Sequence, residues 1–192
     1  MDVGEICLKY YCHINNEPLK SITQLPENEA LNLAKKLRDE NPCVAHSRFG
    51  PIFDEAFVNY YHRRKIVEKL LYDRFVDLGG TPQILAPHYF FVNDWGQMHT
   101  NLIVSEIKNG TANIMEIRLK DIDIAYVSFV LGDTMSEVNS DDWNRILLKD
   151  TLMESITSYG GYENYFNSIK SQYPYIEAQL WTDKYHHLIR TV

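Results

Sequence analysis

The sequence lacks the short motifs that mark the common nucleotide-binding, hydrolytic and metal-dependent enzymes. It contains no phosphate-binding loop ending in Gly-Lys-Ser/Thr, no Gly-x-Gly-x-x-Gly, no Gly-x-Ser-x-Gly and no His-Glu-x-x-His. Because many enzymes carry none of these motifs, their absence excludes only the motif-defined classes.

Long apolar segments are also missing. The longest uncharged apolar run covers residues 124–132, whereas a membrane-spanning helix needs about 20 such residues. The N-terminus carries Asp2 and Glu5 instead of a basic start followed by an apolar stretch, so we expect no signal peptide. These features predict a soluble, cytoplasmic protein that does not bind a membrane.

Cysteine is scarce, and the three that are present are Cys7, Cys12 and Cys43, with no Cys-x-x-Cys pair. An odd number without paired spacing argues against a disulfide framework and favours small buried side chains in a reducing compartment. The alternative is a reactive thiol at Cys43, which follows Asn41-Pro42 in an expected loop.

The chain has fewer basic than acidic residues. Lys and Arg total 19, Asp and Glu total 26, and the formal net charge is -7. Nucleic acids and anionic membranes are bound through a positive field, so neither is expected as a partner. The remaining numbers, 192 residues with 45% hydrophobic and 12% aromatic residues, are those of a globular protein with a sizeable core.

The strongest helical pattern covers residues 54–78, where apolar residues recur every three or four positions until Gly79-Gly80 ends the helix. An earlier helix begins at Pro26, with acidic residues in its first turn, and stops at Asn41-Pro42. Two further helices are predicted over 140–158, with Ser140 as N-cap, and over 162–172.

Strands are predicted from runs of β-branched and aromatic residues between turn residues. Asn109-Gly110 is the pair best suited to a type I′ turn, which predicts a hairpin with arms at 100–108 and 111–119. The run 122–131 is apolar on both faces and is expected near the centre of the sheet. The other predicted strands are 5–14, 87–92 and 175–181.

Elements of one kind cluster along the chain instead of alternating. This order predicts an α+β fold with a mainly antiparallel sheet of about five to six strands packed against about four helices. We expect one compact domain over residues 1–192, and the polar segment 132–140 is the only alternative boundary.

Arg64 falls on the apolar side of the long helix, one turn after Tyr60 and Tyr61. A guanidinium at this position needs a carboxylate, a carbonyl or an anionic ligand, because an unpaired buried charge is costly. The structural hypothesis pairs it with Glu68, four residues further on. The functional hypothesis is that Arg48 and Arg64 bind a carboxylate or phosphate between the two tyrosines.

His88, Asp94 and His99 lie in one stretch around an expected turn at Trp95-Gly96. Histidine and aspartate are ligands for zinc, manganese and iron, but this spacing matches no defined metal motif. We favour a polar loop without a metal here and keep these three residues as the alternative metal ligands.

Strand alternation places Glu177, Gln179 and Trp181 on one face of the last predicted strand. This face either lines a ligand cleft, with Glu177 and the nearby His187 as candidate catalytic acid or base, or is the solvated face of an edge strand. We favour the solvated edge.

Three functional hypotheses follow. The favoured one is a non-catalytic regulatory domain that binds a protein or a small ligand, because every catalytic candidate has a structural explanation. The second is an enzyme acting on an anionic small molecule through Arg48 and Arg64. The third is a metal-dependent hydrolase that uses His88, Asp94 and His99. We expect no cofactor, and a homodimer is an open alternative.

Overall fold

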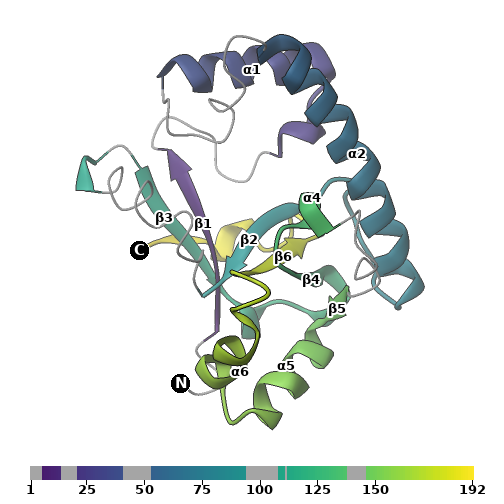
Figure 1. Ribbon diagram of the computed structural model, residues 1–192, viewed down its shortest axis with the longest axis vertical. Coiled ribbons are helices and arrows are strands. Elements are labelled where there is room, and N and C mark those ends of the chain that lie inside the picture. Colours follow the sequence, from purple (N-terminus) through teal and green to yellow (C-terminus); the bar gives the residue numbers. More distant parts are fainter. Residues whose placement is uncertain (1–5, 14–20, 41–52, 94–107, 111, 138–145) are drawn as a thin grey trace.

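The computed structural model describes residues 6–13, 21–40, 53–93, 108–110, 112–137 and 146–192, and Figure 1 shows their arrangement. One antiparallel sheet lies at the centre, with its strands in the order β5-β4-β6-β2-β1-β3-β7. The strands are β1 (Cys7–His13), β2 (His88–Val92), β3 (Ala112–Arg118), β4 (Val127–Leu131), β5 (Leu147–Leu148), β6 (Ile176–Leu180) and β7 (Arg190–Thr191).

The helices pack on both faces of this sheet. They are α1 (Glu27–Glu40), α2 (Phe53–Asp77), the single turn α4 (Thr134–Glu137), α5 (Lys149–Ser158) and α6 (Tyr162–Ile169). Helix α2 packs against one face, while α5 and α6 cover the other (Figure 1). The predicted α+β class is therefore confirmed. Within the described residues the sheet has seven strands instead of five to six, because the edge strands β5 and β7 have only two residues each and leave no sequence pattern.

Each face of the sheet has its own hydrophobic core. On the face covered by α5 and α6, buried residues from β1, β2, β3, β4, β6 and the 3₁₀ turn after β3 meet Leu152, Ile156 and Tyr162 of the two helices. On the opposite face, Trp181 stacks on Phe75 of α2 with ring centroids 5.8 Å apart. A third, smaller cluster joins α1 to the beginning of α2 and contains Phe57 and Tyr61. β6 therefore contributes its apolar residues to the first core, whereas Trp181, directly after the strand, contributes to the second.

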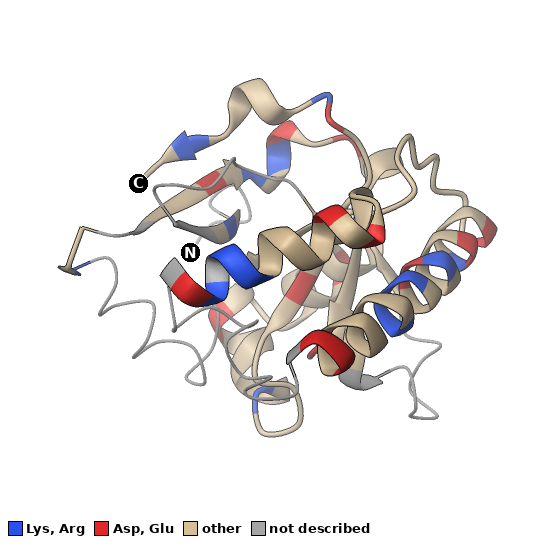
Figure 2. Cartoon of the chain, turned by 90° about the horizontal axis from the view of Figure 1, so that it is seen from above, with Lys and Arg blue, Asp and Glu red and all other residues tan. Residues whose placement is uncertain are grey.

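Helix α2 ends where the sequence predicts. The backbone N–H of Gly80 donates to the carbonyl of Phe75 at 2.9 Å, and that of Gly79 donates to Val76 at 2.9 Å. Gly79 has a φ of 95°, a left-handed conformation that glycine adopts without steric cost. Helix α1 has acidic residues in its first turn and basic residues toward its end, while acidic and basic residues are interspersed along α2 (Figure 2), so neither helix is basic along its whole length.

The predicted helix over 140–158 begins later, at Lys149. Leu147 and Leu148 instead pair with Phe129 and Ser128 of β4 and form the edge strand β5. Residues 138–145, including the expected N-cap Ser140, lie outside the described residues. The hydrogen bonds offered by the edge of β4 therefore outcompete the local helical pattern at Leu147–Leu148.

The predicted strand over 122–131 is shorter than expected, because only Val127–Leu131 is extended. The segment before it forms two 3₁₀ turns, and the Asp123 carboxylate caps the second by accepting the Ala125 backbone N–H at 3.0 Å. The second arm of the predicted hairpin is confirmed as β3. The turn before it is not type I′, because that type needs a positive φ at both central residues and only Gly110, at 69°, has one. The arm predicted over 100–107 lies outside the described residues.

The last long strand, β6, is not the solvated edge strand that we favoured. It lies between β4 and β2, and Gln179 and Trp181 are completely buried under α2. Polar residues alternate along this strand as predicted, but the face that carries them is covered by α2 instead of water. In the described part of the chain, no helix is long and apolar enough to cross a membrane.

Candidate functional site

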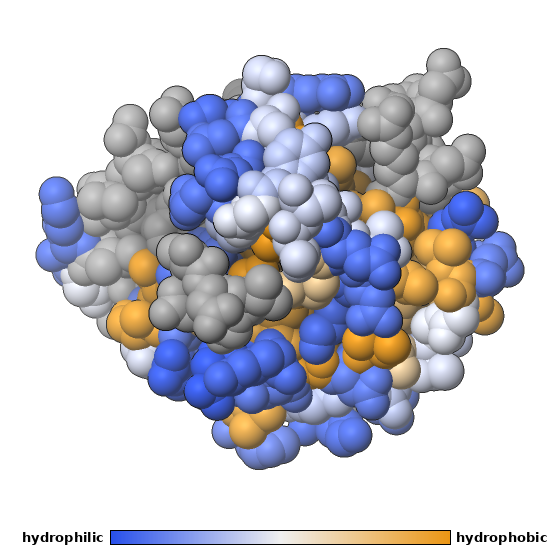
Figure 3. All heavy atoms as spheres, turned by 90° about the horizontal axis from the view of Figure 1, so that it is seen from below, coloured by the Kyte–Doolittle hydropathy of each residue, from blue (hydrophilic) through white to orange (hydrophobic). Residues whose placement is uncertain are grey.

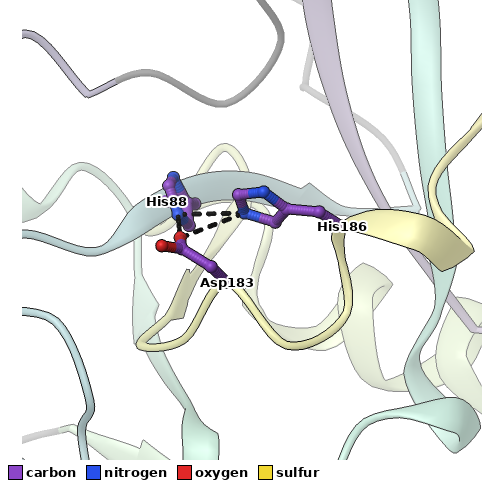
Figure 4. A group of neighbouring side chains, drawn as sticks. All are labelled: His88, Asp183 and His186. Carbon is purple, nitrogen blue, oxygen red and sulfur yellow. Dashed lines mark hydrogen bonds and ion pairs between the residues drawn. The ribbon is translucent and has the colours of Figure 1, made fainter.

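Three side chains with metal-ligating atoms converge where β2 begins and the chain leaves β6 (Figure 4). His88 is the first residue of β2, Asp183 follows β6, and His186 opens the 3₁₀ turn η7 (His186–Leu188). The Nε2 atom of His88 lies 2.7 Å from Oδ1 of Asp183 and 3.2 Å from Nε2 of His186. The Nε2 atom of His186 lies 3.2 Å from the same carboxylate oxygen.

The loop that carries Asp183 and His186 is held at both ends. Before it, Trp181 and Thr182 are fully buried, and the Thr182 hydroxyl accepts the Lys184 backbone N–H at 3.1 Å. Within it, the His186 N–H donates to the Asp183 carbonyl at 3.1 Å, which places both side chains on one turn. Tyr185 is buried, and its hydroxyl accepts the Asp123 N–H at 3.0 Å. The loop is therefore built to hold its two polar side chains over β2.

The three side chains lie at the boundary between core and water. The His88 side chain is 2% exposed, that of His186 is 39% exposed, and that of Asp183 is 63% exposed. Burial lowers the pKa of His186, and His88 lowers it further, while Asp183 raises it. The Nδ1 atom of His88 is buried and has no hydrogen-bond partner within the described ranges, so only Nε2 is engaged.

The donor set suits a divalent transition-metal ion. Two imidazole nitrogens and one carboxylate oxygen are ligands that Zn²⁺, Fe²⁺ and Mn²⁺ accept. Ligand atoms at bond lengths of about 2.0–2.2 Å from a tetrahedral ion lie roughly 3.3–3.5 Å from one another. The separations of 2.7 and 3.2 Å are close to that spacing, so only small side-chain movements are needed to admit an ion. Without an ion, the same groups satisfy one another by hydrogen bonds.

A second polar cluster lies on the opposite face of the sheet, under α2. The Arg64 guanidinium donates to Glu68 at 3.1 Å and to the Tyr60 hydroxyl at 2.6 Å. It also lies over the ring of Tyr89, 4.2 Å from the ring centroid, and the Tyr89 hydroxyl donates to Glu68 at 3.1 Å. The charge of Arg64 is thus compensated inside the protein, as the structural hypothesis expects.

Glu177 is the end point of a hydrogen-bond chain in this cluster. The Trp181 indole N–H donates to the Ser128 hydroxyl at 2.9 Å. That hydroxyl in turn donates to Oε1, the side-chain amide oxygen of Gln179, at 2.9 Å. The Gln179 amide and the Thr134 hydroxyl both donate to Oε1 of Glu177. Burial raises the pKa of the Glu177 carboxyl to about 7, although the Thr134 hydrogen bond and the charge of Arg64 lower it.

No protein-family model, curated protein or solved structure matches the chain.

The structure brings some of the sequence-predicted site residues together and separates others. Arg64, Tyr60 and Glu177 belong to the cluster under α2, where the charge of Glu177 acts on that of Arg64. Tyr61 lies elsewhere and donates to the Leu25 carbonyl at 2.7 Å. His187 is exposed on η7. The other three candidates, Arg48, Asp94 and His99, lie outside the described residues.

The sequence offered His88 only as an alternative metal ligand, with Asp94 and His99, and did not indicate the two partners that the structure places beside it. Asp183 and His186 are 95 and 98 residues away from His88 along the chain, so no spacing motif connects them. The only local indication was the Asp-x-x-His spacing of Asp183 and His186 after the last strand. That spacing alone is too common to identify a site.

Proposed function

We propose that the protein is a small-ligand-binding module whose ligand is a divalent transition-metal ion, held by His88, Asp183 and His186. The observation that carries this proposal is the convergence of three ligand atoms, from two distant segments of the chain, at 2.7 to 3.2 Å.

Two features of the cluster favour an ion over a simple hydrogen-bonded group. The Nε2 atoms of His88 and His186 face each other at 3.2 Å, and two imidazole nitrogens at this distance are compatible only when one donates and the other accepts. A cation between them accepts both lone pairs and the carboxylate charge at once. The loop is also fixed by buried groups on either side of Asp183, which pre-organises the ligands.

The cluster under α2 is less suited to the anion that the sequence suggested. Arg64 already donates to Glu68, and the carboxyl of Glu177 acts on it electrostatically as well. A free carboxylate or phosphate would have to compete with both groups for the guanidinium. The metal site is therefore the better supported ligand-binding site.

The test is a metal titration of the full-length chain after treatment with a chelator. Isothermal titration calorimetry with Zn²⁺, and metal analysis after dialysis, are expected to give one bound ion per chain. His186→Ala should abolish this binding, whereas His187→Ala, a neighbouring exposed histidine on the same turn, should retain it. Equal binding by the two variants, or no binding by the native chain, would contradict the proposal.

The cellular setting is a proposal as well. The three cysteines without paired spacing and the net charge of -7 support a reducing cytoplasm and a ligand other than nucleic acid. On the face seen from below, apolar side chains are broken up by hydrophilic ones (Figure 3), so the described part of this face offers no continuous apolar docking surface. Cell fractionation tests the location, and light scattering tests for the homodimer.

A further inference from the structure

The part of the chain that the structure describes supplies three ligands to the proposed ion. Among the described residues, the group of ligand atoms that lie within 4.8 Å of one another contains His88, Asp183 and His186 and no fourth member. Structural zinc sites are closed by four protein ligands, whereas sites with three protein ligands keep a position for water or for an incoming ligand. The composition of this site is therefore that of an open metal centre.

The exposure of the three ligands shows on which side the open position lies. The His88 side chain approaches from the core and is 2% exposed, while that of Asp183 is 63% exposed. His186, at 39%, is intermediate. An ion bound to all three would have the buried His88 on one side and the more exposed Asp183 and His186 on the other, which places its remaining coordination positions toward the solvent.

Charge decides which kind of ligand takes these positions. A divalent ion with two neutral imidazoles and the single carboxylate of Asp183 leaves a net charge of about +1 at the centre. A carboxylate, hydroxamate or phosphate oxygen neutralises that charge, whereas a cationic or purely apolar molecule does not.

We propose that the ion at His88, Asp183 and His186 binds a small oxyanion directly, through coordination positions on its solvent side. This inference rests on the proposed metal-binding function. In the binding step an oxygen of the anion forms a bond to the ion and a coordinated water leaves, with no change in oxidation state. The site thereby becomes a receptor for a carboxylate- or phosphate-bearing small molecule.

The experiment uses Co²⁺ as the probe ion, because its visible absorption bands respond to coordination number and ligand identity. The full-length chain is loaded with one equivalent of Co²⁺ and titrated with acetohydroxamate, and then separately with inorganic phosphate. The expected result is a saturable shift of the Co²⁺ bands with each anion. The metal-free chain, titrated by calorimetry, should bind neither anion.

The outcomes separate the inference from the function on which it rests. Co²⁺ bands that appear but do not move with millimolar anion would overturn the open site while leaving metal binding intact. Absence of any protein-bound Co²⁺ bands would overturn both. The His187→Ala variant should reproduce the native shift, and circular dichroism of His186→Ala should show that its loss of Co²⁺ binding is not a loss of folding.

Discussion

The guanidinium of Arg64 donates to the carboxylate of Glu68 at 3.1 Å, and Glu68 is only 2% exposed. The two residues lie one helical turn apart on α2, so the pair forms within a single element. Tyr89 from β2 donates to the same carboxylate oxygen at 3.1 Å and thereby joins the helix to the sheet. Removing Arg64 would leave a buried negative charge without its counter-charge.

Arg64→Met is therefore expected to lower the free energy of unfolding by about 3–5 kcal/mol, the usual cost of breaking a buried ion pair on one side. The double variant Arg64→Met/Glu68→Gln should be more stable than Arg64→Met, because the amide removes the unpaired charge and still accepts from Tyr89. Urea denaturation measures both. A stable Arg64→Met protein would show that Arg64 is not a structural residue and would revive its role in anion binding.

Ser128 links Trp181 to Gln179 under α2, and none of the three side chains reaches solvent. Because an indole N–H can only donate, the hydrogen bonds of the chain point in one direction, toward Glu177. Ser128→Ala leaves one buried donor and one buried acceptor unpaired, so we expect it to cost about 1–3 kcal/mol for each group.

The matched control is Ser155→Ala. Ser155 is half-buried, but its hydrogen bond to the Thr151 carbonyl within α5 is exposed to solvent, so its loss is expected to change stability by at most about 0.5 kcal/mol. Chemical denaturation of the two variants side by side makes the comparison. Similar costs for both would mean that the buried chain contributes no net stability.

The carboxyl of Glu177 is expected to make stability fall as the pH rises. Burial raises its pKa in the folded protein to about 7, above its ordinary value of 4.5, so between these two pH values the folded state holds a proton that the unfolded state has already lost. The contribution of this carboxyl to the free energy of unfolding is complete below about pH 4.5 and is lost as the pH rises through about 7. A shift of this size corresponds to about 3 kcal/mol at most.

Arg64, Asp133, Thr134 and Gln179 are the charged and hydrogen-bonding groups that act on this carboxyl. Glu177→Gln removes the titration, so the variant should become more stable than the native protein as the pH rises from 5 to 8. Denaturation at four pH values across that range gives the difference. A constant difference between the two proteins would contradict a raised pKa at Glu177.

Gly80 closes the end of α2 against the ring of Phe75. A Cβ atom at this position would lie 2.4 Å from Cζ of Phe75, whose ring is completely buried. Gly80→Ala must therefore displace a packed ring, and we expect it to cost about 1–3 kcal/mol. Gly110→Ala is the control, because its Cβ meets nothing within 4 Å and only the positive φ of 69° is strained, at about 1 kcal/mol. Thermal unfolding of both variants tests the ranking.

Much of the fold could be predicted because it depends on neighbours in sequence. The spacing of apolar residues along 54–78 and the Gly79-Gly80 pair predicted α2, and Gly79 and Gly80 make the expected closing hydrogen bonds. The pair Arg64–Glu68 was predictable for the same reason, since residues four apart in a helix face each other. The start of α5 was not predictable, because β4 draws Leu147 and Leu148 into the sheet.

The amino-acid sequence by itself determined the α+β class, the long helix and the alternation of polar and apolar residues along β6. Tertiary structure decided what each face of that strand meets. β6 pairs with β4 and β2, which are distant from it in sequence. Because of this pairing, the face that was expected to contact solvent instead carries the buried hydrogen-bond chain that ends at Glu177. The same pairing carries Asp183 and His186 to His88, which no local pattern could reveal, because His88 and Asp183 are 95 positions apart in the sequence.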